Sequence, residues 1–209
     1  MSKEILYATN NPGKVIEVSK LLKHNEINVV SPKDLGIDLD VPEVGKTLEE
    51  NASLKAKAFL AKSNGRAVLS DDTGLEIDAL NGEPGIHVRR WKDGRTKMTD
   101  EKIIDYCIEK MKDLSEGKRG AQFRTVLALA LPNGGIETFE GTLRGEILIK
   151  PALIRIEGFP FESLFYIPEW KMILGEVHQL KADKKDGRFN HRERALQKAV
   201  PRIKEILSK

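Results

Sequence analysis

Two adjacent carboxylates, Asp71 and Asp72, are the residues best suited to metal chemistry. They follow the apolar residues 67–69, which predict a short strand, so residues 70–73 are expected in a turn at the end of that strand. Neighbouring carboxylates repel each other unless a cation or hydrogen-bond donors offset their charge. Mg²⁺ prefers oxygen ligands and in proteins usually takes one or two carboxylates together with substrate phosphates. The sequence therefore predicts a magnesium site at Asp72, with Glu43 as a second ligand, and leaves an acidic turn that caps the next segment as the alternative.

A second polar cluster lies where a predicted strand at residues 5–8 gives way to a helix that opens at Lys14. The turn between them contains Thr9, Asn10, Asn11 and Gly13. Free N–H groups at a helix N-terminus, together with a hydroxyl, two side-chain amides and a lysine, suit a bound phosphate. The Gly-x-x-x-x-Gly-Lys-Ser/Thr pattern is absent, which excludes a P-loop. An ordinary strand-to-helix turn without a ligand is the alternative.

The basic pair His191-Arg192 precedes a predicted closing helix at residues 193–207, which Pro201 is expected to bend. Exposed basic residues are poorly placed against the positive end of a helix dipole, so an anionic or keto-bearing ligand would explain the pair. Two solvent-facing residues in a basic stretch explain it equally well. Residues 181–204 hold nine Lys and Arg against three Asp and Glu, a balance that suits small polyphosphates.

Several predicted elements must position these groups. A helix is expected to begin at Thr47, whose capping box with Glu50 marks its start, and Asn51 and Lys55 share one side of it because they are four residues apart. A further amphipathic helix is expected to begin at Thr99.

Strands and helices alternate without a simple repeat. Residues 123–131 and 136–149 favour strands, and residues 132–135 have the composition of a hairpin turn between them. Residues 151–186 form too long a stretch for a plain connection and are expected to be functional or partly structured. The mixed order predicts an α/β fold, or mixed α+β fold, around a mixed sheet.

Length and composition limit the class of protein. A chain of 209 residues with 40% hydrophobic composition can bury a core as a single domain over residues 1–209, or as two closely joined lobes. The longest apolar run, residues 126–131, is far shorter than the roughly 20 residues of a membrane-spanning helix. No signal-peptide pattern is present, so we expect a cytoplasmic protein without a membrane partner. The net charge of +3 gives no support to a nucleic-acid partner, and the single cysteine, Cys107, is expected to be a buried apolar residue.

The order of these groups resembles the inosine triphosphate pyrophosphatase family, the non-standard purine NTP pyrophosphatases. The similarity is carried by Glu-Asn-Ala-x-x-Lys-Ala from Glu50 and Ser-Asp-Asp-Thr-Gly-Leu from Ser70, and it is dense up to residue 90. It implies an elongated central mixed sheet flanked by helices, two lobes with the nucleotide in the cleft between them, and a homodimer. It also implies that water attacks the α-phosphorus of ITP, dITP or XTP and pyrophosphate leaves, which protects the nucleotide pool from deaminated purines.

The resemblance assigns roles to the matching positions. The resemblance implies that Asp72 is the general base and a metal ligand and that Glu43 is the second acidic ligand. It also implies that Asp71 holds its neighbour Asp72 in place. Lys14 and Lys55 would neutralise the triphosphate, since phosphoryl transfer depends mainly on positioning and charge stabilisation. The substrate-binding positions implied are Thr9, Asn10, Asn11, Gly13, Lys14, Asn51, Thr73, Phe159, Phe161, Glu162, Lys185, His191 and Arg192.

Base recognition is where the sequence departs from the family. Arg192 donates hydrogen bonds and accepts none, so it should favour a 6-keto purine over adenine, and Phe159 can stack on a base. The family usually has Gly-Phe-Gly-Tyr/Trp-Asp-Pro in the base-binding loop, whereas residues 158–163 read Gly-Phe-Pro-Phe-Glu-Ser here. The family has a lysine five residues before the His-Arg pair, where this chain has Asp186, and Lys185 lies one position earlier. Residues 87–90 read His-Val-Arg-Arg in place of a Tyr-Ser-Ala-Arg-like run. We therefore hypothesise altered or broadened base specificity; a related pyrophosphatase for a modified pyrimidine or oxidised purine and a non-hydrolysing nucleotide-binding module are the alternatives.

Overall fold

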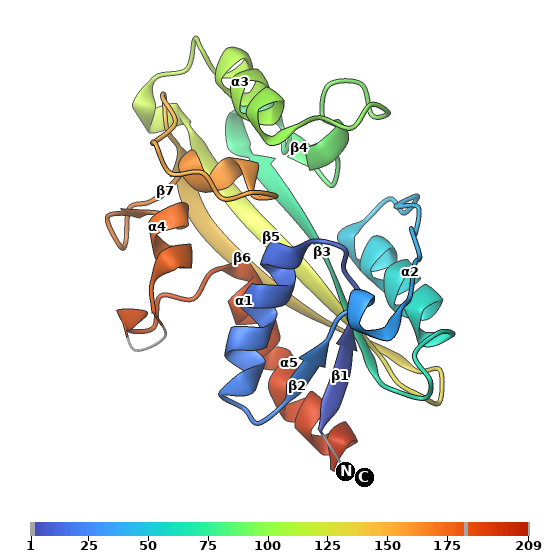
Figure 1. Ribbon diagram of the computed structural model, residues 1–209. Helices are drawn as coiled ribbons and strands as arrows, with labels where there is room; N and C mark the ends of the chain where they lie inside the picture. The colour runs from blue at the N-terminus through green and yellow to red at the C-terminus, as the bar shows by residue number, and fades with distance from the viewer. Residues whose placement is uncertain (1–2, 182–183, 209) are drawn as a thin grey trace. The chain divides into compact units, whose positions relative to one another are not determined.

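A computed structural model describes residues 3–181 and 184–208, and it shows a mixed α/β fold (Figure 1). Its helices and strands, in chain order, are β1 (Glu4–Tyr7), α1 (Pro12–Lys23), β2 (Asn28–Val30), α2 (Leu48–Leu60), β3 (Val68–Ile77), β4 (Pro84–Gly85), α3 (Asp100–Lys110), β5 (Gly120–Ala130), β6 (Ile136–Ile147), β7 (Phe165–Ile167), β8 (Met172–Ile173), α4 (Leu174–Gln179) and α5 (His191–Leu207). The strands are hydrogen-bonded in the order β2-β1-β3-β5-β6-β7-β8, with β4 on β3. β1 is parallel to β2 and β3, whereas β7 is antiparallel to β6 and β8, so the predicted mixed sheet flanked by helices is confirmed.

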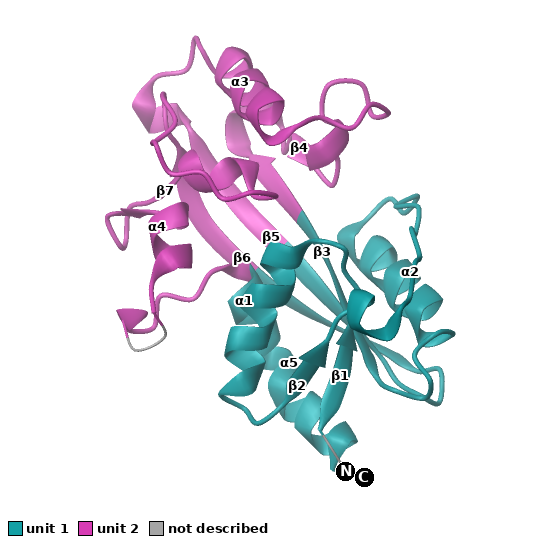
Figure 2. Cartoon of the chain, viewed as in Figure 1, with its two compact units in different colours: residues 1–73, 125–141, 192–209 teal, residues 74–124, 142–191 magenta. Residues whose placement is uncertain are grey.

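The chain divides into two compact units (Figure 2). Unit 1 comprises residues 1–73, 125–141 and 192–209, and unit 2 comprises residues 74–124 and 142–191. The strands β3, β5 and β6 each continue from one unit into the other along the chain. The single domain and the nucleotide cleft stay predictions.

Unit 1 has a core in which strand side chains pack against α1 and α5. Ile5 and Tyr7 of β1 are fully buried in the same cluster as Leu22 of α1 and Leu196 of α5. Leu6 lies between Ile5 and Tyr7 and is also fully buried, as expected of a strand in a parallel sheet that is covered on both faces.

The predicted helices and hairpin are largely confirmed. Thr47 caps α2 and Thr99 caps α3, each through its side chain. The Leu131 N–H donates to the Gly135 carbonyl at 2.8 Å, which closes the predicted hairpin between β5 and β6. The closing helix α5 begins at His191, two residues before the predicted start, and contains Pro201. No helix in the described part of the chain is long and apolar enough to cross a membrane.

Unit 2 has an aromatic core. The ring centroid of Phe123 lies 6.2 Å from that of Phe161 and 4.8 Å from that of Phe165, and the ring centroids of Trp91 and Phe161 are 6.1 Å apart. The stretch at residues 151–186 contains β7, β8, α4 and a short 3₁₀-helix at Pro160–Ser163, so its partly structured character is confirmed for the described residues.

We expect Gly145→Ala to lower the free energy of unfolding by about 1–3 kcal/mol, because overpacking a dense interior forces its neighbours to shift. A Cβ on Gly145 would lie 2.4 Å from Cε1 of Phe165 and 2.5 Å from the Tyr166 carbonyl oxygen. Urea denaturation measures the difference. Gly117→Ala is the matched control, since a Cβ there meets nothing within 4 Å; equal stability of the two variants would contradict the close approach of β7 to β6.

The thiol of Cys107 is expected to be unreactive in the native protein. The residue is fully buried, and burial raises the pKa of its thiol to about 12, so the reactive thiolate is scarce at pH 8. Titration with a disulfide reagent should detect no thiol in native buffer and one per chain in urea. Rapid native labelling would contradict the burial.

Candidate active site

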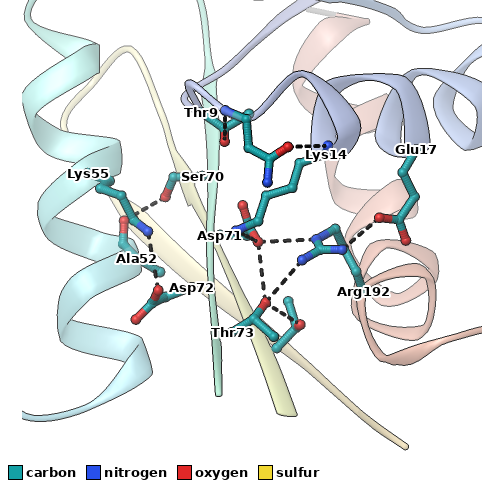
Figure 3. A network of polar contacts seen from close by, with 12 residues as sticks. Thr9, Lys14, Glu17, Ala52, Lys55, Ser70, Asp71, Asp72, Thr73 and Arg192 are labelled. Atoms are coloured by element: carbon teal, nitrogen blue, oxygen red, sulfur yellow. Dashed lines mark hydrogen bonds and ion pairs between the residues drawn. The ribbon is translucent and has the colours of Figure 1, made fainter. Parts of the chain in front are cut away.

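The two adjacent aspartates lie within the long strand β3, so the prediction of a turn at residues 70–73 is wrong. Successive side chains of a strand point to opposite faces, which separates the carboxylates of Asp71 and Asp72. Each is then bound by donors from different helices, and the Ser70 hydroxyl donates to the Ala52 carbonyl of α2 at 2.6 Å (Figure 3). These contacts hold turn-forming residues in an extended strand, and the positive donors offset the repulsion expected between the carboxylates.

Asp72 faces α2. Its Oδ2 accepts from Nδ2 of Asn51 at 3.1 Å, and its Oδ1 accepts from Nζ of Lys55 at 3.3 Å. The same Nζ donates to Oε1 of Glu43 at 2.9 Å, so one ammonium group joins the two predicted metal ligands. The backbone N–H of Gly45 donates to Oδ1 of Asn51 at 2.8 Å, which leaves the amide nitrogen directed at Asp72. The prediction that Asn51 and Lys55 share one side of a helix is confirmed.

The charges in this group affect one another. Burial raises the pKa of Asp72 above its ordinary value, Lys55 opposes that rise, and Glu43 adds to it. Burial lowers the pKa of Lys55, but the carboxylates of Asp72, Asp71 and Glu43 outweigh it and raise that pKa overall. Lys55 therefore stays charged, and Asp72 is a stronger base than an ordinary carboxylate.

Asp71 points the other way and organises a buried network (Figure 3). Its Oδ1 accepts from the Tyr7 hydroxyl at 2.7 Å, and its Oδ2 accepts from Nζ of Lys14 at 2.8 Å and from Nε of Arg192 at 3.1 Å. Burial alone would raise the pKa of Asp71, but Lys14 and Arg192 hold it well below its usual range. Asp71 thus supports Lys14 and Arg192 on the opposite face of β3 from Asp72, whereas the resemblance implied that it holds Asp72 itself.

Arg192 is engaged by side chains of unit 1. Beyond Asp71, its Nη1 donates to Oε2 of Glu17 at 2.6 Å and its Nη2 donates to Oγ1 of Thr73 at 3.3 Å, and only 3% of its side chain is exposed. The guanidinium of Arg192 is thus bound by carboxylate and hydroxyl groups of unit 1, and its role as a donor to a 6-keto base stays a prediction. Sequence reasoning also missed Glu17, although it lies three residues after Lys14 and so on the same side of α1.

The turn before α1 differs from the predicted phosphate cradle. Oδ1 of Asn11 accepts from the backbone N–H groups of Gly13 at 2.9 Å and Lys14 at 3.3 Å, and the Asn11 N–H donates to Oγ1 of Thr9 at 3.2 Å. The expectation of free amides is therefore wrong, because an Asn at the N-cap satisfies them. Nδ2 of Asn10 donates to the Leu39 carbonyl at 3.3 Å.

The residues of unit 2 that were predicted to bind the base differ in their exposure to solvent. Phe161 is 2% exposed and belongs to the aromatic core, so it is not available to stack on a base. His191 is also buried, and its ring stacks on Phe123 at 4.6 Å with 20° between the planes. Phe159 is half-buried and remains the better placed aromatic residue.

Glu162 and Phe159 share a neighbour that sequence reasoning missed. Oε1 of Glu162 lies 2.9 Å from Nδ1 of His178, and the His178 ring meets Phe159 edge-on at 5.1 Å. Lys185 is half-buried, and its carbonyl accepts from the backbone N–H of Arg188 at 2.8 Å. The structure thus brings the predicted phosphate and metal residues together within unit 1, and Phe159 with Glu162 within unit 2.

Comparisons with known proteins show the family of the chain. The model of the Ham1 family matches residues 5–202. A dITP/XTP pyrophosphatase of Clostridium perfringens is 37% identical over 98% of this chain and 99% of its own length, and one of Desulforamulus reducens is 39% identical over 99% and 96%. The Ham1 protein structure from Staphylococcus aureus superposes with a TM-score of 0.75 at 34% identity, covering 97% of this chain and 99% of that one. The resemblance is confirmed, and the chain belongs to the Ham1 family, the inosine triphosphate pyrophosphatase family.

Proposed function

We propose that this chain is a nucleoside-triphosphate pyrophosphatase that hydrolyses the non-standard purine nucleotides dITP, XTP and ITP to the monophosphate and pyrophosphate. Such an enzyme removes deaminated purines from the nucleotide pool. Relatives named dITP/XTP pyrophosphatases match nearly the full chain at 34–39% identity. The observation that carries the proposal is the cluster in which Lys55 joins Asp72 to Glu43 while Asp71 holds Lys14.

We assign Mg²⁺ to Glu43 and Asp72. No group of three or more His, Cys, Asp or Glu residues suited to a metal occurs among the residues that the structure describes. Two carboxylates nevertheless fit Mg²⁺, because this ion keeps several waters and takes further oxygens from substrate phosphates. The Lys55 ammonium between them is direct support that the pair accepts a positive charge. When bound, the ion would supply charge neutralisation and a water of lowered pKa.

The side chains divide the remaining work. Asp72 would orient the attacking water and accept its proton, a role helped by the pKa that burial raises. Lys14 and Lys55 would neutralise charge on the triphosphate, since catalysis of phosphoryl transfer depends on positioned cations. The other phosphate-side contacts proposed are Thr9, Asn10, Asn11, Gly13, Asn51 and Thr73.

Base recognition is assigned to unit 2. Phe159 would stack on the purine and Lys185 would lie beside it. Glu162 and His191 are both buried, so they would complete the site by holding His178 and the Phe123 ring. The bond between Glu162 and His178 supports a second candidate, a pyrophosphatase with changed base preference, because it joins the altered loop to a partner that the family pattern did not predict. A homodimer and a cytoplasmic location also belong to the proposal.

A substrate screen tests the proposal. Pyrophosphate release would be measured in Mg²⁺ with ITP, XTP, dITP, dUTP and the four standard triphosphates. We expect the 6-keto non-standard purines to be the best substrates, whereas preference for dUTP would favour the second candidate. No release from any of them would refute the enzyme.

A further inference from the structure

The residue before Phe159 is held at both of its backbone polar groups by one ion pair. Oδ2 of Asp100, the first residue of α3, accepts from the N–H of Gly158 at 2.7 Å. Nη2 of Arg89 donates to the carbonyl of the same Gly158 at 2.8 Å. Nη1 of Arg89 and Oδ1 of Asp100 are also bonded to each other, so the two side chains and Gly158 form a closed set of contacts within unit 2.

These hydrogen bonds to Gly158 fix the direction of the backbone that leads into Phe159. The N–H of Gly158 belongs to the peptide plane before the residue and its carbonyl to the plane after it, so holding both fixes the torsions between them. Gly158 has a φ of +84°, a left-handed conformation that favours glycine. Hydrogen bonds with one charged partner are shorter and stronger than neutral ones. The side chains of Arg89 and Asp100 are only 30% and 25% exposed, which limits competition from water.

The ring of Phe159 is restrained at its other end. His178 meets it edge-on, and Glu162 holds the imidazole of His178 through Nδ1. The backbone N–H of Phe159 donates to the Ile156 carbonyl at 3.0 Å. Glu101, which follows Asp100 in α3, also binds the chain before Gly158, because its Oε1 accepts from Nε of Arg155 at 2.8 Å.

We propose that Arg89 and Asp100 are positioning residues for the nucleobase: they hold Gly158 so that the ring of Phe159 is presented for stacking. The inference rests on the proposed function, in which Phe159 stacks on the purine. Residues 87–90 are a run in which this chain differs from the family pattern. The inference gives this run a role, because its Arg89 donates to the Gly158 carbonyl. Pre-organising a binding loop improves affinity because less freedom is lost on binding.

The test compares a ligand that has a base with one that has none. In the full-length enzyme with Mg²⁺, inhibition constants of IMP and of pyrophosphate would be measured for the wild type, Arg89→Met and Asp100→Asn. We expect the constant for IMP to rise about tenfold in both variants, equivalent to about 1.4 kcal/mol, and the constant for pyrophosphate to stay unchanged. Arg89→Lys, which can keep one contact but not the planar fork, should be intermediate. Arg144→Met is the matched control, because it breaks the Arg144–Asp78 pair of the same unit.

A double variant separates positioning from general stability. In a Phe159→Ala background, Arg89→Met should weaken IMP no further, since it acts through the missing ring. Equal weakening of IMP and pyrophosphate, or an unchanged IMP constant in Arg89→Met and Asp100→Asn, would overturn the inference while wild-type pyrophosphate release leaves the proposed function standing. If the wild type releases no pyrophosphate from any nucleotide, the proposed function fails and this inference with it. Thermal midpoints check folding, and Asp100→Asn decides the matter if Arg89→Met does not fold.

Discussion

Asp72→Asn is expected to lower kcat about a thousandfold, the loss typical of removing a positioned general base. The replacement keeps the shape of the side chain and can still contact Asn51 and Lys55, but it cannot take a proton from water and is a weaker ligand for Mg²⁺. The steady-state rate of pyrophosphate release from ITP gives the measurement. Because Asp72 lies among donors at the edge of the buried network, the variant should fold.

The control for this variant is Asp78→Asn. Asp78 forms an exposed pair with Arg144 at 2.6 Å and lies outside the proposed site, so its loss should leave the rate near that of the wild type. A rate within a few-fold of the wild type for Asp72→Asn would remove this carboxylate from the chemistry and require another base.

Arg192→Met is expected to destabilise the fold by about 3–5 kcal/mol, the usual result of leaving a buried charge without its partner. The guanidinium contacts two carboxylates, Glu17 and Asp71, which are 6% and 1% exposed in their side chains. The free energy of unfolding in urea measures the effect. A residue that served only to read a base would lose affinity for the nucleotide with little change in stability.

A double-mutant cycle with Glu17→Gln isolates the pair. Neutralising Glu17 removes one of the stranded charges, so the double variant should be less destabilised than the sum of the single variants. Arg202→Met is the matched control on the same helix, because Arg202 pairs with Glu137 and Glu205 at the surface and its loss should change stability little. Equal effects of Arg192→Met and Arg202→Met would contradict the buried network.

Local sequence predicted the helices that carry the site because their signals are local. The cap at Thr47 and the four-residue spacing of Asn51 and Lys55 placed both side chains correctly on α2, where they reach Asp72. The position of Asp71 and Asp72 could not be predicted in this way. Their sequence favours a turn, and only contacts with residues distant in the chain keep them in β3.

The roles of Arg192 and Phe161 also depend on distant partners. Glu17 lies 175 residues from Arg192 in the chain, so no spacing rule joins them. Phe161 keeps the aromatic character of the base-binding loop, yet it packs against Trp91 and Phe123, because an aromatic ring suits a core as well as a ligand. The residue types of the site were therefore readable from the sequence, whereas the direction of each side chain was decided by tertiary packing.

The proposed reaction requires that the chain cleave the bond between the α- and β-phosphates. Phosphorus NMR of ITP incubated with the enzyme and Mg²⁺ tests it most directly, because the products of the possible cleavages have distinct resonances. We predict IMP and pyrophosphate in equal amounts, with no accumulation of IDP. Formation of IDP and inorganic phosphate, or unchanged ITP under conditions in which the protein is folded, would refute pyrophosphate release by this chain.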